Sequence, residues 1–167
     1  MKNLKSGILA LAILLVYSCT KDNGVVPQSE FFVLMDNSQI IHITSEEDNE
    51  VLHSFQIDGG ENFVFQYQFN EKESSAVVDD EYGYTFTFEV DKDVESFVVE
   101  GTELEALKAH FREVGAWVSH RQVPVITGKV SGQKLASNRW AIQIDVKAES
   151  HSSGIVKEIV VDATFEK

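Results

Sequence analysis

The chain has 167 residues, of which 43% are hydrophobic and 25% charged, a composition typical of a globular protein rather than a disordered or fibrous one. Its formal net charge at pH 7 is −13, which excludes nucleic acid and anionic lipid as favoured partners of its surface because both would repel it. The single cysteine excludes the class of small domains held together by disulfides.

The charge is distributed unevenly along the chain. Between Glu30 and Glu105 there are twenty acidic residues and two basic ones, whereas residues 106–167 contain six acidic residues and nine basic ones. Solvation of an exposed protein is the simplest explanation of the acidic half. A cationic partner is the alternative, and a steep salt dependence of binding would favour it.

The segment from Met1 to Cys19 has the layout of an export signal. Two lysines precede an apolar run from Ile8 to Tyr17, which is too short to cross a bilayer because a spanning helix needs about 20 apolar residues. Ser18 and the single cysteine follow directly. An apolar residue, Val16, three positions before the cysteine and a small residue immediately before it resemble the lipobox of bacterial lipoproteins.

In that family, the cysteine thiol receives a diacylglyceryl group, a signal peptidase cuts before the cysteine, and the new amino terminus is acylated, for instance with palmitate. The resemblance implies that residues 1–18 are a lipoprotein signal peptide and that Cys19 is the lipid-attachment residue. Two or more acyl chains hold a protein stably on a bilayer, since each buried methylene contributes about 0.8 kcal/mol. The alternative is a plain signal peptide followed by an incidental cysteine.

After the cysteine, the chain is polar up to Ser29 and shows no periodicity, so we expect a flexible tether over residues 19–29. Lys21-Asp22 resembles the export signal of Bacteroidota-type surface lipoproteins. Thr20 is not the aspartate that retains other Gram-negative lipoproteins at the inner membrane. The resemblance therefore implies an exported, lipid-anchored protein of the outer membrane, with exposure on the cell surface as a further expectation.

Residues 30–167 predict a single β-rich globular domain. Two pairs of short runs are each expected to form a hairpin: 30–36 with 39–44 around Asn37-Ser38, and 50–57 with the next run around Asp58-Gly59-Gly60. Aromatic residues occupy alternate positions in that next run and in one later strand, at Phe63, Phe65, Tyr67, Phe69, Tyr84, Phe86 and Phe88. One face of each strand is expected to line the core.

The period changes after Glu100. Thr102 and Glu105 match a capping box, and Gly115 suits a helix C-terminus. Between them, apolar residues recur at helical spacing, at Leu104, Leu107, Phe111 and Val114. We therefore expect one amphipathic helix over about residues 102–114.

Three strands over 123–131, 140–148 and 155–165 are expected to close the domain as an antiparallel meander. Trp140 stands at the head of an apolar stripe and is expected to be buried. The predicted fold class is mainly β (α+β): an antiparallel β-sandwich or a curled sheet with one helix.

Candidate chemistry is sparse, and no catalytic residue or cofactor is predicted. The five histidines are scattered, and no H-x-x-x-H or H-x-H spacing places two on one face, so no zinc site is expected. Acidic turns offer oxygen ligands for calcium, at Glu46, Glu47, Asp48, Asp79 and Asp80. Solvated charge is the default interpretation of these turns, because the alternating acidic calcium loop is absent.

Among the aromatic residues, Tyr82 and Trp117 are the candidates for stacking on a sugar ring or a peptide. The leading hypothesis is a non-catalytic binding or interaction module of the envelope, whose partner beyond the membrane is a glycan or an envelope protein. A structural accessory subunit of an envelope complex is the alternative. A hydrolase that uses a carboxylate pair is a third hypothesis.

Replacing the cysteine tests the anchor. Cys19→Ser is expected to move the protein out of the membrane fraction, because a serine hydroxyl cannot take the thioether-linked lipid. Cell fractionation and mass spectrometry of the mature amino terminus measure this, with Thr20→Ser as the matched control that stays on the membrane. An unlipidated wild-type terminus, or a Cys19→Ser protein that remains on the membrane, would contradict the prediction.

Overall fold

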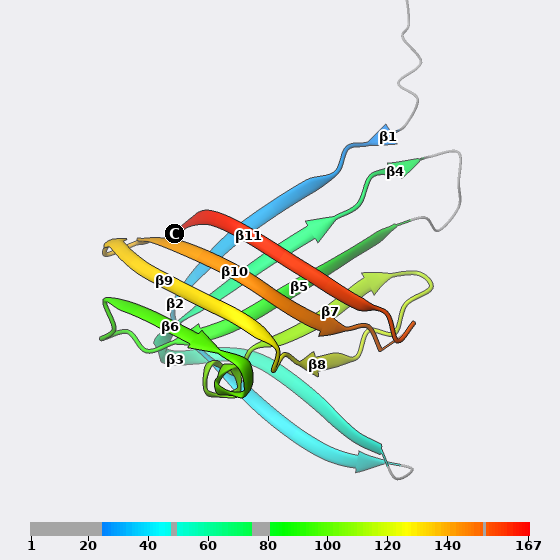
Figure 1. Cartoon of the computed structure of the whole chain (residues 1–167), viewed down its shortest axis with the longest axis horizontal. Helices are drawn as coiled ribbons and strands as arrows, with labels where there is room; N and C mark the ends of the chain where they lie inside the picture. Colours follow the sequence, from blue (N-terminus) through cyan, green and yellow to red (C-terminus); the bar gives the residue numbers. More distant parts are fainter. Residues whose placement is uncertain (1–24, 48–49, 75–80, 152) are drawn as a thin grey trace, which may run out of the picture.

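The computed structural model describes residues 25–47, 50–74, 81–151 and 153–167, and it confirms a mainly β fold (Figure 1). Nine of the described strands form one sheet, in the spatial order β6-β9-β10-β11-β2-β3-β5-β7-β8. Their bounds are β2 (Ser29–Glu47), β3 (Glu50–Asn70), β5 (Tyr82–Val90), β6 (Ser96–Glu100), β7 (His110–Gly115), β8 (Gln122–Pro124), β9 (Gly128–Ala136), β10 (Arg139–Glu149) and β11 (Val156–Glu166). Two short strands, β1 (Val25–Val26) and β4 (Glu73–Ser74), pair with each other.

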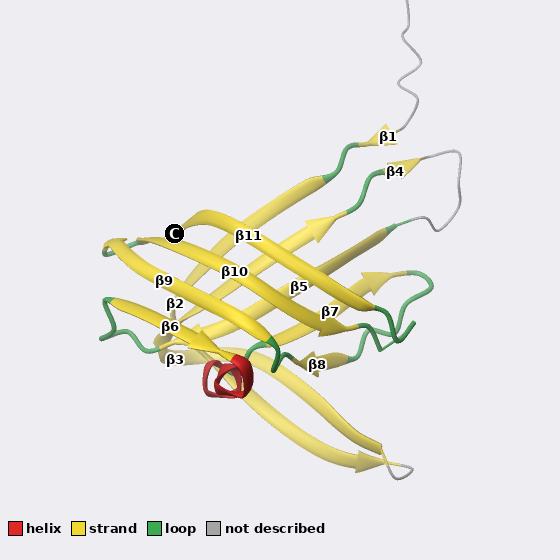
Figure 2. Ribbon diagram, in the orientation of Figure 1, coloured by secondary structure: helices red, strands yellow, loops and turns green. Residues whose placement is uncertain are grey.

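The large sheet is mixed and strongly curled. Its neighbouring strands are antiparallel except β11 and β2, which meet in parallel where Glu166 lies opposite Val33. Figure 2 shows β6, β9, β10 and β11 crossing in front of β2, β3, β5 and β7, so that the sheet folds over on itself as a half-barrel. Of the two architectures that the sequence leaves open, the protein has the curled sheet. The last three strands form the expected antiparallel meander, but its first strand, β9, begins at Gly128, and residues 122–124 form the separate strand β8, which pairs with β7.

Aromatic side chains fill the concave side of the curl, as their alternation along β3 and β5 predicts. Phe65 is fully buried, stacked on Phe88 with ring centroids 5.0 Å apart and edge-on to Trp140 at 5.6 Å. The indole N–H of Trp140 is buried without a hydrogen-bond partner, so packing alone holds this ring. On β9, Gly132 leaves room for the ring of Phe97 opposite it, because a Cβ there would lie 2.4 Å from that ring.

Strands β2 and β3 form one long hairpin instead of the two short hairpins that the turn residues predict. The turn dipeptides at 37–38 and 59–60 lie across from each other and form a bulge, in which Ser38 faces both Gly59 and Asn62. Asn37 adopts a left-handed conformation there, with φ of 51°. Residues that tolerate such conformations serve a bulge as well as a turn, so the same residues bend the hairpin instead of ending its strands.

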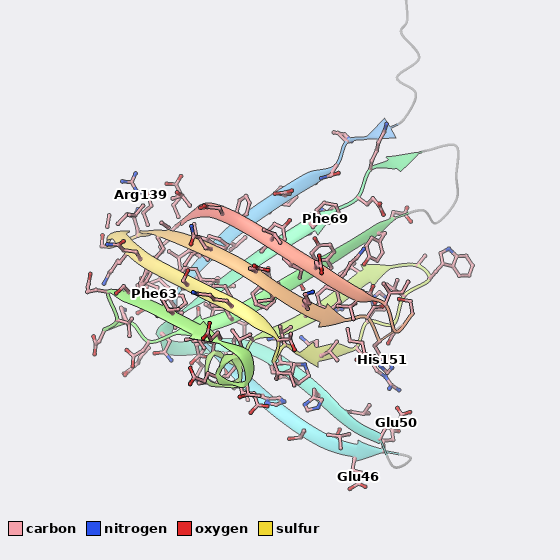
Figure 3. The ribbon with its side chains drawn as sticks, viewed as in Figure 1. Glu46, Glu50, Phe63, Phe69, Arg139 and His151 are labelled. Atoms are coloured by element: carbon pink, nitrogen blue, oxygen red, sulfur yellow. The ribbon has the colours of Figure 1, made fainter. Side chains whose placement is uncertain are left out.

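Beyond the bulge, residues 39–47 and 50–58 form a two-stranded extension, called the ribbon below. It packs Ile40 and Phe55 against Val64 in a second small core. Gln122 on β8 fastens the ribbon, because its side-chain Nε2 donates to the Phe55 carbonyl (2.9 Å) and its Oε1 accepts from the Phe55 N–H (2.7 Å). Figure 3 shows Glu50 at the far end of the ribbon.

A buried carboxylate on β5 fixes the base of the ribbon. Glu89 is 7% exposed and accepts hydrogen bonds from the backbone N–H of Ile40 and from Asn62 Nδ2 at 2.5 Å. Lys108 Nζ donates to both of its oxygens, at 3.1 and 3.0 Å. These charge-assisted bonds offset the cost of removing the carboxylate from water.

The helix is shorter than the sequence predicts. It is a 3₁₀ helix, η1 (Gly101–Leu107), that ends where Lys108 adopts a left-handed conformation, and no side chain caps its start. Leu104 and Leu107 are buried as expected, but the prediction of helix over 110–114 is wrong. Those residues belong to β7, where Phe111 lies opposite Phe86 of β5. No helix in the described part of the chain combines the length and apolarity needed to cross a bilayer.

Removing the buried carboxylate tests its role. Glu89→Ala is expected to lower the free energy of unfolding by about 3 kcal/mol, because it leaves the buried Ile40 N–H and the Lys108 ammonium without their acceptor. Urea denaturation measures the loss. Glu158→Ala is the control: it breaks the solvent-exposed ion pair with Lys147 and is expected to leave the midpoint nearly unchanged. Equal midpoints for both variants would contradict the role of Glu89.

Candidate functional site

The sequence candidates fall in different parts of the chain. Cys19 and three calcium candidates, Asp48, Asp79 and Asp80, lie outside the described residues. The other two, Glu46 and Glu47, are exposed at the end of the ribbon. Within the ranges that the structure describes, no three His, Cys, Asp or Glu side chains gather into a group that could hold a metal ion.

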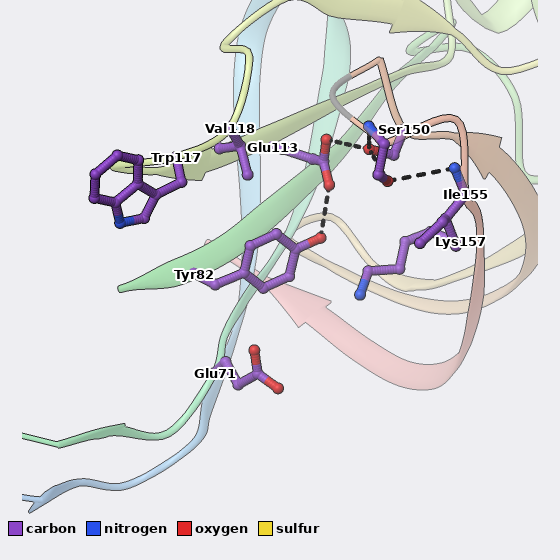
Figure 4. A pocket seen from close by; sticks show the side chains of 9 residues that line it. Glu71, Tyr82, Glu113, Trp117, Val118, Ser150, Ile155 and Lys157 are labelled. Atoms are coloured by element: carbon purple, nitrogen blue, oxygen red, sulfur yellow. Dashed lines mark hydrogen bonds between the residues drawn. The ribbon is translucent and has the colours of Figure 1, made fainter. Parts of the chain in front are cut away.

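The two aromatic candidates, in contrast, line the same pocket. Tyr82 begins β5 and Trp117 follows the end of β7, and both border a pocket of about 390 Å³ (Figure 4). Gly115 ends β7 opposite Tyr82, where a Cβ would lie 2.5 Å from the Glu81 carbonyl oxygen, so only glycine allows this close approach. The remaining lining residues are Glu71, Glu113, Val118, Ser150, Ser153, Ile155 and Lys157.

Glu113 forms the polar floor of the pocket. Its side chain on β7 is 5% exposed, and its two oxygens accept hydrogen bonds from different segments, as Figure 4 shows. The Tyr82 hydroxyl donates to Oε1 at 2.9 Å, and the Ser150 hydroxyl donates to Oε2 at 2.6 Å. Ser153 in turn donates its hydroxyl to Ser150 Oγ at 3.0 Å. One carboxylate therefore joins β5, β7 and the turn between β10 and β11.

The ammonium group of Lys157 lies over the ring of Tyr82 at the pocket. Lys157 Nζ lies 4.7 Å from the centroid of the Tyr82 ring, within the range of a cation–π contact. Burial and then the hydrogen bond to Glu113 raise the pKa of Tyr82 well above its ordinary value. The phenol therefore stays protonated at neutral pH and keeps donating to the carboxylate.

The described lining residues offer stacking surfaces and hydrogen-bonding groups, and among them no nucleophile is paired with a base. Trp117 is 80% exposed, so its indole is open to a ligand. Each oxygen of Glu113 already accepts one hydrogen bond from a hydroxyl group, and a carboxylate can accept further hydrogen bonds at its remaining lone pairs. This arrangement is suited to binding a small ligand that has one flat apolar face and several hydroxyl or amide groups.

Comparison with known proteins gives no relative: no protein-family model, curated protein or solved structure matches the chain.

A second cluster, which the sequence did not predict, lies on the ribbon. His42 Nε2 and His53 Nδ1 are 2.9 Å apart, although no sequence spacing pairs them. The ring of Phe55 lies between two imidazoles, with centroids 4.2 Å from His42 and 4.2 Å from His110. The strand register explains the cluster: His42 lies opposite Phe55 and Thr44 opposite His53, so the three rings share one face.

The buried members of both sites were missed because they look ordinary in the sequence. Glu113 falls in the segment that was predicted as helix, and the sequence gives no sign that its carboxylate is buried while the neighbouring Arg112 and Val114 are exposed. To predict the histidine cluster, the acidic turn near residues 46–49 has to be recognised as the end of a hairpin. The register of that hairpin then decides which alternate residues face each other on its two strands.

The stack makes stability depend on pH through His110. Burial holds the pKa of His110 at about 4, below its ordinary value of 6.5. Above pH 6.5 the ring is neutral in both states, whereas between pH 6.5 and 4 only the unfolded chain takes up the proton. Stability is therefore expected to fall by roughly 3 kcal/mol as the pH falls through this interval.

Urea denaturation of the wild type and of His110→Gln at a series of pH values measures this dependence. The difference between the two proteins isolates His110 from the other charged groups nearby, which are His42 across Phe55 and the Lys108–Glu89 pair. Parallel pH profiles for the two proteins would contradict the prediction.

Proposed function

We propose that the chain is a lipid-anchored protein of the bacterial envelope and that its β domain binds a saccharide, without catalysis, at the Tyr82–Trp117 pocket. The observation that carries the proposal is the 80% exposure of the Trp117 indole beside a pocket whose floor is a buried carboxylate. A large aromatic ring left in water next to converging polar groups is characteristic of a binding site.

The chemistry of the pocket matches that of a sugar ring. A pyranose presents C–H groups on one face, which pack on an aromatic ring, and hydroxyls around its rim, which both donate and accept hydrogen bonds. Trp117 and Tyr82 supply aromatic surface, while Glu71, Ser153 and Lys157 supply acceptors and donors. The volume of about 390 Å³ lies at the small end of the range for ligand pockets, which favours one or a few rings over a long polymer.

The position of the pocket fits an anchor at Cys19. The backbone N–H of Glu71 donates to the Tyr82 carbonyl (2.8 Å), and β4 begins two residues later, paired with β1. The start of β5, which carries the pocket residue Tyr82, lies at the same end of the sheet as β1 and β4 (Figure 1). Five residues lie between Cys19 and Val25, so the lipid would lie within roughly 20 Å of β1. A ligand carried near the membrane surface is therefore within reach.

Tryptophan fluorescence offers a direct test, because the chain has two tryptophans in opposite environments. Trp117 is exposed and Trp140 is fully buried, so a sugar that covers the pocket is expected to change the long-wavelength emission of Trp117 alone. Glycans selected on an array with the full chain supply the ligands for titration. Trp117→Ala is expected to weaken binding by about tenfold or more, as loss of a central aromatic contact does.

Val160→Ala is the matched control, since Val160 is 73% exposed on β11 and does not line the pocket. Silence on the array together with a stable neighbour in pull-downs would instead favour a structural subunit. Release of reducing sugar during the titration would favour a hydrolase, because Glu71 and Glu113 both border the pocket.

A further inference from the structure

The exposed histidine pair on the ribbon has the spacing of a metal-binding site. Imidazole nitrogens bind Zn²⁺ at about 2.0–2.1 Å, so two of them around one ion lie about 2.9 Å apart at a right angle and about 3.3 Å apart at a tetrahedral angle. His42 Nε2 and His53 Nδ1 are separated by 2.9 Å. The ring centroids are 5.2 Å apart, so the two nitrogens point almost directly at each other, and an ion can replace their hydrogen bond once each ring turns to aim its lone pair at the ion.

The plane of the His42 ring is fixed before any ion binds. His42 lies flat on Phe55, with an interplanar angle of 9°, and Phe55 lies equally flat on the buried His110, at 7°. The backbone of Phe55 is itself fixed by its two hydrogen bonds with the Gln122 side chain. A ligand ring whose plane is already fixed loses less conformational freedom when an ion binds, which favours affinity.

We propose that His42 Nε2 and His53 Nδ1 bind one divalent transition-metal ion of the kind that prefers imidazole, Zn²⁺, Ni²⁺ or Cu²⁺, with water completing its coordination. The site is separate from the saccharide pocket, because its ligands come from β2 and β3 and none of them lines that pocket. It also differs from the calcium candidates at the end of the ribbon, whose carboxylates are the ligands of a harder ion.

Isothermal titration of the full chain with Zn²⁺ tests the proposal. All proteins carry Cys19→Ser and no histidine tag, which removes the thiol and any added imidazoles as competing ligands. The parent protein is expected to bind one equivalent, and Cu²⁺ is expected to bind more tightly than Ni²⁺ or Zn²⁺. His42→Gln and His53→Gln are each expected to weaken binding by more than about tenfold, since losing even an outer partner of a metal ligand costs 10- to 100-fold.

His120→Gln is the matched control, an exposed histidine on another segment, and is expected to bind as the parent does. Thermal unfolding shows that each variant is folded and gives a second readout: Zn²⁺ should raise the midpoint of the parent and of His120→Gln but not that of the double variant His42→Gln/His53→Gln. The proposal is overturned if the parent binds no Zn²⁺, if only one of the two single variants loses affinity, or if the double variant binds as tightly as the parent.

Discussion

The fold depends on one constraint: a sheet of nine strands with one aromatic face must curl to remove that face from water. Phe65, Phe86 and Phe88 are fully buried, and they are covered from the other side of the curl by Trp140 and Phe165 of β10 and β11. In the part of the chain that the structure describes, no helix layer performs this task, since η1 contributes only Leu104 and Leu107 to the core. The hydrophobic effect therefore acts within a single sheet, and β11 meets β2 to connect its two halves.

Some segments of the curled sheet are not fixed by the hydrogen bonds between its strands alone. Two buried carboxylates fix these segments. Glu89 on β5 binds the base of the ribbon, and Glu113 on the neighbouring β7 binds the turn between β10 and β11. Each accepts hydrogen bonds from more than one segment, so the cost of burial is offset where the chain most needs a fixed position. The Tyr82–Trp117 pocket and the histidine pair both lie beside segments fixed in this way.

The alternation of apolar and polar residues along the strands was the sequence pattern that predicted the structure best. It located the aromatic faces of β3 and β5 and the buried side of β10, because strands with one buried face show their environment in the alternation itself. The prediction that the helix continues to residue 114 is wrong for a related reason. Leu104 and Leu107 have helical spacing, and Phe111 continues that spacing by coincidence although it lies on a strand. The left-handed Lys108 that separates them has no distinctive residue type to reveal it.

Long-range features were harder to predict. The glycines at 59–60 and Asn37 matched hairpin turns, yet their pairing across two strands makes a bulge, and only the register of the whole hairpin decides between the two outcomes. The sequence indicates Tyr82 and Trp117 as two separate candidates for stacking on a ligand, and the structure places both at one pocket. Glu113, which joins the walls of that pocket, could not be selected from 27 acidic residues without knowing which strand it occupies.

The central claim is that ligand binding occurs at this end of the sheet. Hydrogen–deuterium exchange of the full chain, with and without a glycan that it selects, measures this for every backbone segment in one experiment. We expect slower exchange in peptides covering residues 113–118 and 150–157, with exchange in the ribbon unchanged. Protection confined to the ribbon or to the outer side of β9–β11, with none at the pocket, would contradict the account.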